Sequence, residues 1–142
     1  MQKDECGIRN ERYPLMERTA DALRAASGRP ADEISLAALA AGELTDDDLR
    51  ITPDALRSQA EIAGQAGFPQ LAANLRRAAE LTAVPNADLL RMYETLRPGR
   101  ATYGQMIALA ERLKGEFGAH ETAAFVREAA EVYRARGLTK KE

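Results

Sequence analysis

The stretch TPDALRSQAEIAGQAGFPQLAANLRRAAELTAVP, residues 52–85, decides the fold. Its apolar residues recur at intervals of three and four, which is the spacing of an amphipathic helix and not the alternation of a strand. Thr52-Pro53 is a strong start signal, because threonine accepts hydrogen bonds from the first-turn amides and proline at the first helical position loses none. We therefore predict one helix over 53–66, stopped by Gly67, and a second over 69–82.

Projected at 100° per residue, both segments divide into an apolar and a polar face. The predicted apolar face of the first helix comprises Ala55, Leu56, Gln59, Ile62, Ala63 and Ala66. That of the second comprises Leu71, Leu75, Ala78, Leu81 and Thr82, whereas Arg76, Arg77 and Glu80 point outward.

Three more segments with the same spacing predict helices over 86–96, 103–117 and 119–135, the middle one capped by Thr102 and stopped by Gly118. Their predicted inward residues are Leu89, Met92, Tyr93 and Leu96, then Tyr103, Met106, Leu109, Ala110, Leu113 and Phe117, and then Thr122, Phe125, Val126, Ala129, Val132 and Tyr133. The sequence thus predicts an all-α protein, an irregular helical bundle of about five main helices joined by short turns.

The N-terminal third is less regular, and we expect short helices and turns there. Thr45 and Asp48 have the spacing of a capping box, which predicts one further helical turn. Residues 1–12 and 139–142 are polar and unpatterned, so we expect two loosely held tails around a single helical domain over residues 13–138. With 28 alanines and only seven aromatic residues, the core should be modestly stable without a partner.

Composition bounds the function. Twenty basic and 22 acidic residues give a net charge of −2, which disfavours binding to nucleic acid or to an anionic membrane. The basic set holds 16 arginines, the cation enriched in protein interfaces, although a GC-rich coding sequence would explain them equally well. Without an apolar leader or a run of roughly 18 apolar residues, we expect a cytoplasmic protein that does not enter the membrane.

The sequence holds no recognisable active site. One histidine, His120, and one cysteine, Cys6, cannot supply the three or four soft ligands of a zinc site, and we assign neither of them a role. Residues 46–48, three consecutive aspartates, lack the spacing of a calcium loop, so we interpret them as a solvated helix start. No glycine-rich phosphate loop or nucleophile elbow occurs.

Two alternatives remain open at this point. The two helices flanking Gly67, followed by Arg76-Arg77, have the outline of a helix-turn-helix DNA-binding motif, although Glu61 and Glu80 favour a salt-bridged surface instead. The other alternative is enzymatic activity of the chain by itself, for which the sequence offers no nucleophile beside a base.

Several segments carry a resemblance to a known family. They are, in order, YPL at 13–15, DLRITP at 48–53, RAAELTAVP at 77–85, LRP at 96–98 and AAFVREAAEVY at 123–133. In this order and spacing they resemble the small (gamma) subunit of coenzyme-B12-dependent diol and glycerol dehydratases, over nearly the whole stretch from 13 to 133.

The resemblance implies a noncatalytic subunit of a lyase that converts 1,2-diols or glycerol to aldehydes, with loss of water, by a radical mechanism. It implies that adenosylcobalamin and a metal ion are held by the large (alpha, TIM-barrel) and medium (beta) subunits, in an assembly with two copies of each chain. This chain would pack on and stabilise the large subunit. The choice between glycerol and 1,2-propanediol would lie in the large subunit.

The resemblance also directs attention to three residues. Gln59 lies within the predicted apolar face, where the family also has glutamine, so we expect a buried amide with a hydrogen-bond partner, most simply a neighbouring helix end. With Arg97 and Arg127, which flank apolar stripes, Gln59 is a candidate for the subunit interface. Gly99 and residues 27–29 depart from the family pattern, which weakens contact predictions there.

Some family members carry a long N-terminal extension linked with packaging in a bacterial microcompartment. Only 12 residues precede Tyr13 in this sequence. We therefore expect that any such packaging depends on another subunit.

Overall fold

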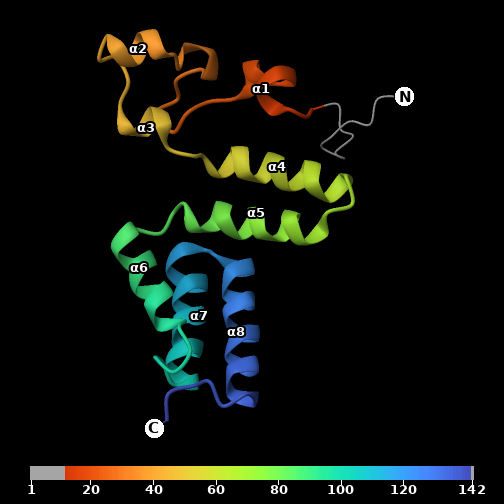
Figure 1. Cartoon of the computed structure of the whole chain (residues 1–142), viewed down its shortest axis with the longest axis vertical. Coiled ribbons are helices and arrows are strands. Elements are labelled where there is room, and N and C mark those ends of the chain that lie inside the picture. The colour runs from red at the N-terminus through yellow and green to blue at the C-terminus, as the bar shows by residue number, and fades with distance from the viewer. Residues whose placement is uncertain (1–11, 142) are drawn as a thin grey trace. The chain divides into compact units, whose positions relative to one another are not determined.

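The computed structural model of the chain describes residues 12–141, and the regular secondary structure in this range is helical (Figure 1). One isolated bridge pairs Arg24 with Pro30. The all-α class predicted from the sequence is confirmed. The chain forms two compact units, an N-terminal unit that ends at Ala79 and a C-terminal unit that begins at Glu80, while the single domain predicted over 13–138 stays a prediction.

The N-terminal unit begins with short elements. Helices α1 (Leu15–Arg18), α2 (Leu36–Ala40) and α3 (Asp46–Leu49) have four or five residues each, and 3-10 turns span Ala20–Ala22 and Ala31–Glu33. Helices of this length are not stable by propensity alone, so side-chain contacts must hold them in place. This irregular N-terminal third agrees with the prediction.

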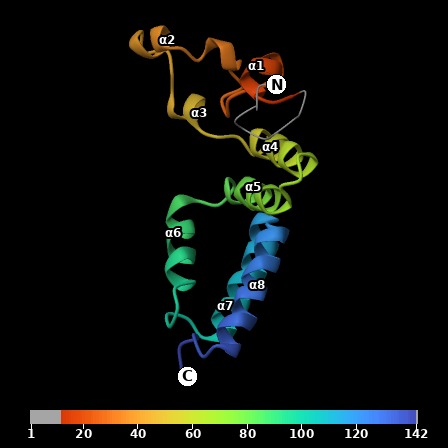
Figure 2. The same cartoon turned by 45° about the vertical axis from the view of Figure 1, so that its right-hand side comes forward.

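The two helices of the opening stretch form as predicted. Helix α4 (Pro53–Gln65) and helix α5 (Pro69–Leu81) run side by side and antiparallel in both views (Figures 1 and 2). The Thr52 hydroxyl accepts a hydrogen bond from the Ala55 amide at 3.2 Å and so caps α4. Gly67 has φ +86° and turns the chain between the helices, a conformation that favours glycine.

The C-terminal unit is built from three further helices, α6 (Asn86–Thr95), α7 (Tyr103–Phe117) and α8 (His120–Ala135). Thr102 caps α7, and Gly118 ends it in the left-handed conformation with φ +63°. Helices α7 and α8 pack antiparallel along their length (Figure 2). The five main helices of the prediction are therefore α4 to α8.

Alanine dominates the buried set, as the composition predicted. Among residues 12–141, ten of the seventeen buried hydrophobic residues are alanines. The larger members are Leu56, Ile62, Val84, Met92, Met106, Leu113 and Val126. Small side chains let helix axes approach closely, but each buries little apolar surface.

The predicted faces need correction in α4 and α5. In α4 the structure buries Leu56, Ala60, Ile62 and Ala63, while Gln59 is exposed. In α5 it buries Ala72 and Ala79 and leaves Leu71 exposed. Where two helices pack closely, the residues between them are small, mostly alanines. A hydropathy projection does not show which alanines of a helix lie at such a contact.

Three residues predicted to point inward in the C-terminal unit are exposed instead: Tyr93 in α6, and Phe125 and Val132 in α8. Helix α8 buries Thr122, Ala123, Val126 and Ala130. The apolar stripe of each helix is wider than the strip its neighbours cover, so its margins stay open to solvent.

The C-terminal segment is held more firmly than the sequence predicted. The Gly99 amide donates to the Leu138 carbonyl at 2.7 Å, and the Lys140 amide donates to the Ala101 carbonyl at 2.8 Å. The chain after α8 is therefore fixed along the turn between α6 and α7.

Candidate interaction surface

Thirteen large hydrophobic side chains are exposed in the described part of the chain. They are Tyr13, Met16, Leu36, Leu39, Leu49, Ile51, Phe68, Leu71, Leu90, Tyr93, Phe125, Val132 and Leu138. Single exposed hydrophobic residues are normal, but contiguous groups mark interaction sites. Leu36 and Leu39 lie one turn apart on α2 in the N-terminal unit, and Leu90 and Tyr93 lie one turn apart on α6 in the C-terminal unit.

The exposed face of α6 combines apolar and basic side chains. Leu90 and Tyr93 lie one helical turn apart and are 70% and 61% exposed. Arg97 follows four residues after Tyr93, just beyond the end of the helix, and forms an ion pair with Glu94 at 3.2 Å. The same carboxylate pairs with Arg100 at 3.4 Å. Two guanidinium groups thus share one carboxylate.

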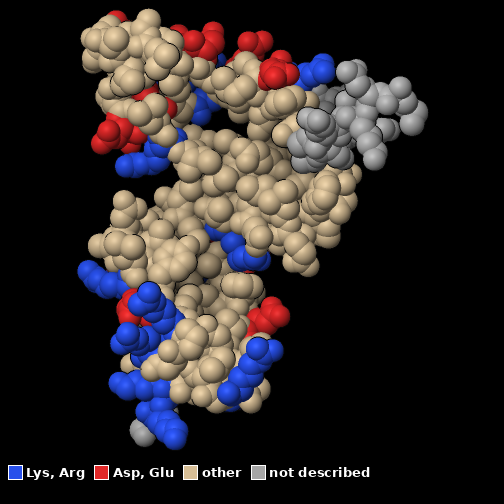
Figure 3. Space-filling model, viewed as in Figure 1, with Lys and Arg blue, Asp and Glu red and all other residues tan. Residues whose placement is uncertain are grey.

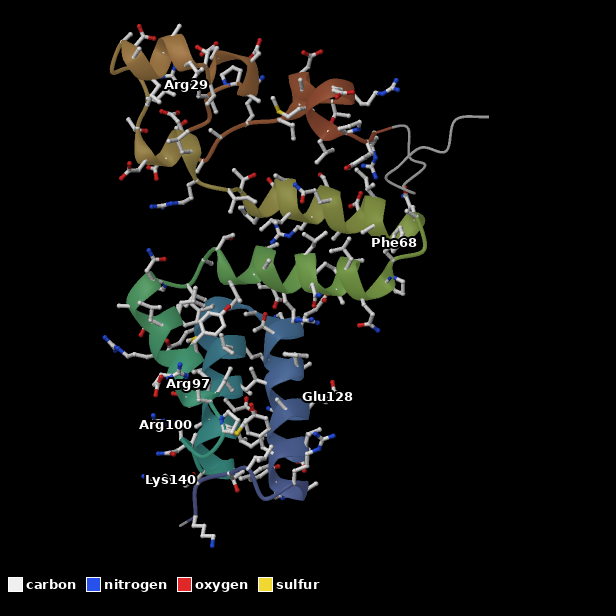
Figure 4. The ribbon with its side chains drawn as sticks, viewed as in Figure 1. Arg29, Phe68, Arg97, Arg100, Glu128 and Lys140 are labelled. Atoms are coloured by element: carbon white, nitrogen blue, oxygen red, sulfur yellow. The ribbon has the colours of Figure 1, made fainter. Side chains whose placement is uncertain are left out.

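Basic side chains continue from this face onto the C-terminal segment. Figure 4 shows Arg97, Arg100 and Lys140 along one side of the C-terminal unit. Figure 3 shows Lys and Arg atoms gathered on that side, with few acidic atoms between them. The hydrogen bond from the Lys140 amide to Ala101 keeps Lys140 next to the turn that carries the two arginines.

The other two candidate interface residues are accessible as well. Arg127 on α8 forms an ion pair with Glu111 on α7, and both side chains are about half exposed. The Gln59 amide was predicted to be buried, which is wrong, and the described residues provide no hydrogen-bond partner for its side chain. Gln59 is exposed although it lies on the same side of α4 as the buried Ile62 and Ala63, so its amide is available to a partner.

Asp48 differs from the solvated helix start predicted for residues 46–48. Asp46 and Asp47 are exposed as expected, but Asp48 is buried in a polar network of the N-terminal unit. Its carboxylate accepts hydrogen bonds from Ser27 Oγ at 2.5 Å and Arg29 Nε at 3.2 Å. It also accepts from the Thr45 amide at 2.7 Å, the bond that the capping-box prediction required.

These donors determine the acidity of Asp48. The hydrogen bond from Ser27, followed by that from the Thr45 amide, lowers the pKa of Asp48 from its ordinary 3.8 to about 2, and the charge of Arg29 adds to the effect. A carboxylate that accepts from three neighbours and stays ionised is a poor general base. Asp48 therefore acts as a structural connection between the turn at 27–29 and α3.

Glu80 was predicted to lie on the outer face of α5, and the structure assigns it another role. Its carboxylate accepts from the backbone amides of Glu121 and Thr122, each at 2.8 Å, and from the Thr122 hydroxyl at 2.6 Å. Ala119, at the N-cap position of α8, has no side chain that could do so. Glu80 thus supplies, from 41 residues earlier in the chain, the acceptor that the first turn of α8 needs.

No group of three His, Cys, Asp or Glu side chains that could hold a metal ion occurs within residues 12–141. His120 is exposed at the start of α8, and Cys6 lies outside the described residues. None of the helices in this range combines the length and apolar character that a membrane span needs.

The helix-turn-helix alternative gains little from the structure. Both arginines have interaction partners, Arg77 with Asn74 among them. Arg76 is exposed and Arg77 is partly buried. The pair therefore does not form a free basic face on α5.

Comparison with known proteins identifies the family. A family model described as dehydratase small subunit matches residues 8–140. The chain belongs to the dehydratase small-subunit family. The propanediol dehydratase small subunits of Citrobacter freundii and Salmonella typhimurium are 44% and 43% identical to it over 121 residues, which cover 85% of this chain and 70% of each relative.

Membership of the dehydratase small-subunit family agrees with the resemblance found in the sequence motifs. Sequence reasoning missed Leu90 and the role of Lys140. The spacing of Leu90, Tyr93 and Arg97 at i, i+3 and i+7 was a usable signal, whereas nothing local indicates that Lys140 returns to the turn after α6.

Proposed function

We propose that this chain is the noncatalytic small subunit of an adenosylcobalamin-dependent diol (propanediol) or glycerol dehydratase. In this function it packs on the large subunit and stabilises it, while the partners convert the diol to an aldehyde with loss of water. The family match over residues 8–140 is the observation that carries the proposal. The names of the two relatives, both propanediol dehydratase small subunits, support this substrate class.

The structure supports a role in an assembly. Leu36 on α2 is 84% exposed, and Leu39, Leu49 and Ile51 in the same unit are more than half exposed. Among the described residues of this unit, the large buried hydrophobic side chains are Leu56 and Ile62. Covering such residues with a partner removes apolar area from water at roughly 25 cal/mol per Å². Burial against a larger subunit would therefore stabilise this chain as well as the partner.

We propose that the large and medium subunits hold adenosylcobalamin and the metal ion. The described residues do not fit either group, because Asp48 and Glu80 are occupied by protein donors and His120 stands without companion ligands. No step of the reaction is therefore assigned to a residue of this chain.

The proposed partners are the large TIM-barrel subunit and the medium subunit, with two copies of each chain. Gln59, Arg97 and Arg127 are proposed interface residues, since all three side chains are accessible. We place the assembly in the cytoplasm.

The decisive experiment is coexpression of this chain with the large and medium subunits of its own dehydratase. We expect an affinity tag on this chain to recover all three subunits in equal amounts. The recovered complex should form aldehyde from 1,2-propanediol or glycerol when adenosylcobalamin is added, and this chain alone should form none. Recovery of a monodisperse free chain beside an intact complex of the other two would contradict the proposal.

Substitutions that change the side-chain charge then test two of these interface residues one at a time. Arg127→Glu should lower recovery of the complex more than it lowers the helicity of the free chain, and Gln59→Glu should behave likewise. Equal loss of recovery and helicity would assign these residues to the fold of the chain itself.

A further inference from the structure

We propose that the outer face of α6, together with the C-terminal segment beside it, is a docking surface for a carboxylate-bearing surface of another dehydratase subunit. We define this α6 surface as Leu90, Tyr93, Arg97, Arg100 and Lys140. The inference rests on the proposed function, and it names which part of the chain meets a partner and what chemistry that partner presents.

The apolar centre of the α6 surface comes from the helix itself. Met92 is 5% exposed and belongs to the core cluster with Val84, Ala110 and Leu113. Leu90 lies almost opposite Met92 on α6 and Tyr93 about 100° round from it, and both are exposed. Tyrosine beside arginine is the pairing enriched at the energetic centres of protein interfaces, because both give large contact area together with hydrogen bonds.

Within residues 12–141 the charge of the α6 surface is not balanced. Glu94 is shared by Arg97 and Arg100, at 3.2 and 3.4 Å. On the same helix Asp88 pairs with Arg91 at 3.7 Å and with Arg112 at 3.4 Å, and Arg112 also pairs with Glu116 at 2.8 Å.

Lys140 has no carboxylate partner among the described residues, so cations outnumber carboxylates around α6. A guanidinium that shares its carboxylate retains donors for another one. The partner surface that complements these cations therefore carries carboxylates.

The α6 surface is also held in place before binding. The Tyr133 hydroxyl donates to the Leu96 carbonyl at 2.9 Å and fixes the end of α6 on α8. The amides of Gly99 and Lys140 connect the turn with the C-terminal segment. Because the cations are carried on a braced backbone, a partner would order few additional groups on binding, which favours affinity.

A protein partner fits this surface better than a nucleic acid does. The whole chain has a net charge of −2, which would repel a polyanion approaching from any other side. The two exposed apolar side chains at the centre suit a partner that carries apolar groups among its carboxylates. Binding of a duplex is retained as an outcome of the test.

The test uses the coexpressed three-subunit complex with Arg97→Glu, Lys140→Glu and Tyr93→Ala in this chain. We expect each to weaken association of this chain with the other subunits about tenfold or more, measured as the dissociation constant of purified components. Raising the salt concentration should weaken association of the unmodified chain more than that of the Arg97→Glu chain, because the variant has lost the attraction that salt screens.

Arg57→Glu is the matched control. Arg57 on α4 is 57% exposed and pairs at 3.1 Å with Asp54, three residues earlier. Arg97 is likewise 66% exposed and pairs at 3.2 Å with Glu94, three residues earlier. We expect the Arg57→Glu chain to associate as the unmodified chain does. Circular dichroism of each free variant should match that of the unmodified chain, because the replaced side chains are exposed.

The outcomes separate the inference from the proposed function. If the unmodified chain does not associate with the other subunits, the proposed function fails, and this inference fails with it. If the unmodified chain associates and the three variants match Arg57→Glu, the function stands and the α6 surface is overturned. A salt-sensitive shift of duplex DNA by the unmodified chain, lost in Arg97→Glu, would also overturn it in favour of a nucleic-acid partner.

Discussion

Replacement of Glu80 tests how the C-terminal unit is held together. Its carboxylate accepts three hydrogen bonds from the first turn of α8, two from the amides of Glu121 and Thr122 and one from the Thr122 hydroxyl. Thr122 is 7% exposed, so water cannot easily replace the lost acceptor. We predict that Glu80→Ala destabilises the chain and frays the start of α8.

The magnitude follows from the three bonds. Hydrogen bonds to a charged group contribute about 1.5–3 kcal/mol each, but bonds to one carboxylate are not additive. Loss of an N-cap by itself costs about 0.5–2 kcal/mol. We therefore expect Glu80→Ala to lower the free energy of unfolding by about 2–4 kcal/mol. Glu80→Gln, which keeps one acceptor oxygen but no charge, should lower it by about 1–2 kcal/mol.

The assay is urea unfolding of the full chain followed by circular dichroism, with Glu128 as the control position. Glu128 lies on the exposed side of α8, as Figure 4 shows, and makes no ion pair within the described residues. Glu128→Ala and Glu128→Gln should change the free energy of unfolding by less than about 0.5 kcal/mol. In thermal unfolding, Glu80→Ala should lower Tm by roughly 4 °C per kcal/mol, or on the order of 10 °C.

The reasoning is refuted if Glu80→Ala and Glu128→Ala unfold at the same urea concentration. That result would mean that water or Thr122 itself satisfies the first turn of α8. An equal loss in Glu80→Ala and Glu80→Gln would contradict only the ranking, and would show that the charge matters more than the acceptor oxygen.

Three further predictions follow from single contacts. Leu113→Ala removes a side chain that is 2% exposed and should lower the free energy of unfolding by about 2–5 kcal/mol in the urea assay, whereas a cost below 1 kcal/mol would mean that the core collapses around the cavity. Gly118→Ala should cost about 1 kcal/mol, although a Cβ there meets no atom within 4 Å, because φ +63° strains any other residue; unchanged stability would show that the turn relaxes. The pKa of Asp48 is lowered to about 2, so its ionised form stabilises the fold fully above pH 4 and this stabilisation is lost as the pH falls through about 2. Asp48→Asn should therefore lose less stability than the unmodified chain between pH 4 and 2, and parallel pH profiles would contradict the assignment.

Sequence alone determined the class of the protein and the limits of its main helices. The start of α4 at Pro53 and the end of α7 before Gly118 depend on residues within one turn of the boundary. A cap or a left-handed glycine acts through the backbone of its immediate neighbours, so its effect can be derived from local spacing. The motifs that carried the resemblance are likewise contiguous, and the family followed from them.

Only the tertiary structure decided which side chains meet. Asp48 finds Ser27 and Arg29 some 20 residues away, and Glu80 finds Thr122 at a separation of 42 residues. It also decided that Gln59 and Tyr93, which both lie on predicted apolar faces, remain exposed. The hydrophobic pattern specifies that a helix has an apolar side. How much of that side is covered depends on how many neighbouring elements reach it. The covered area is therefore a property of the packed molecule and its partners.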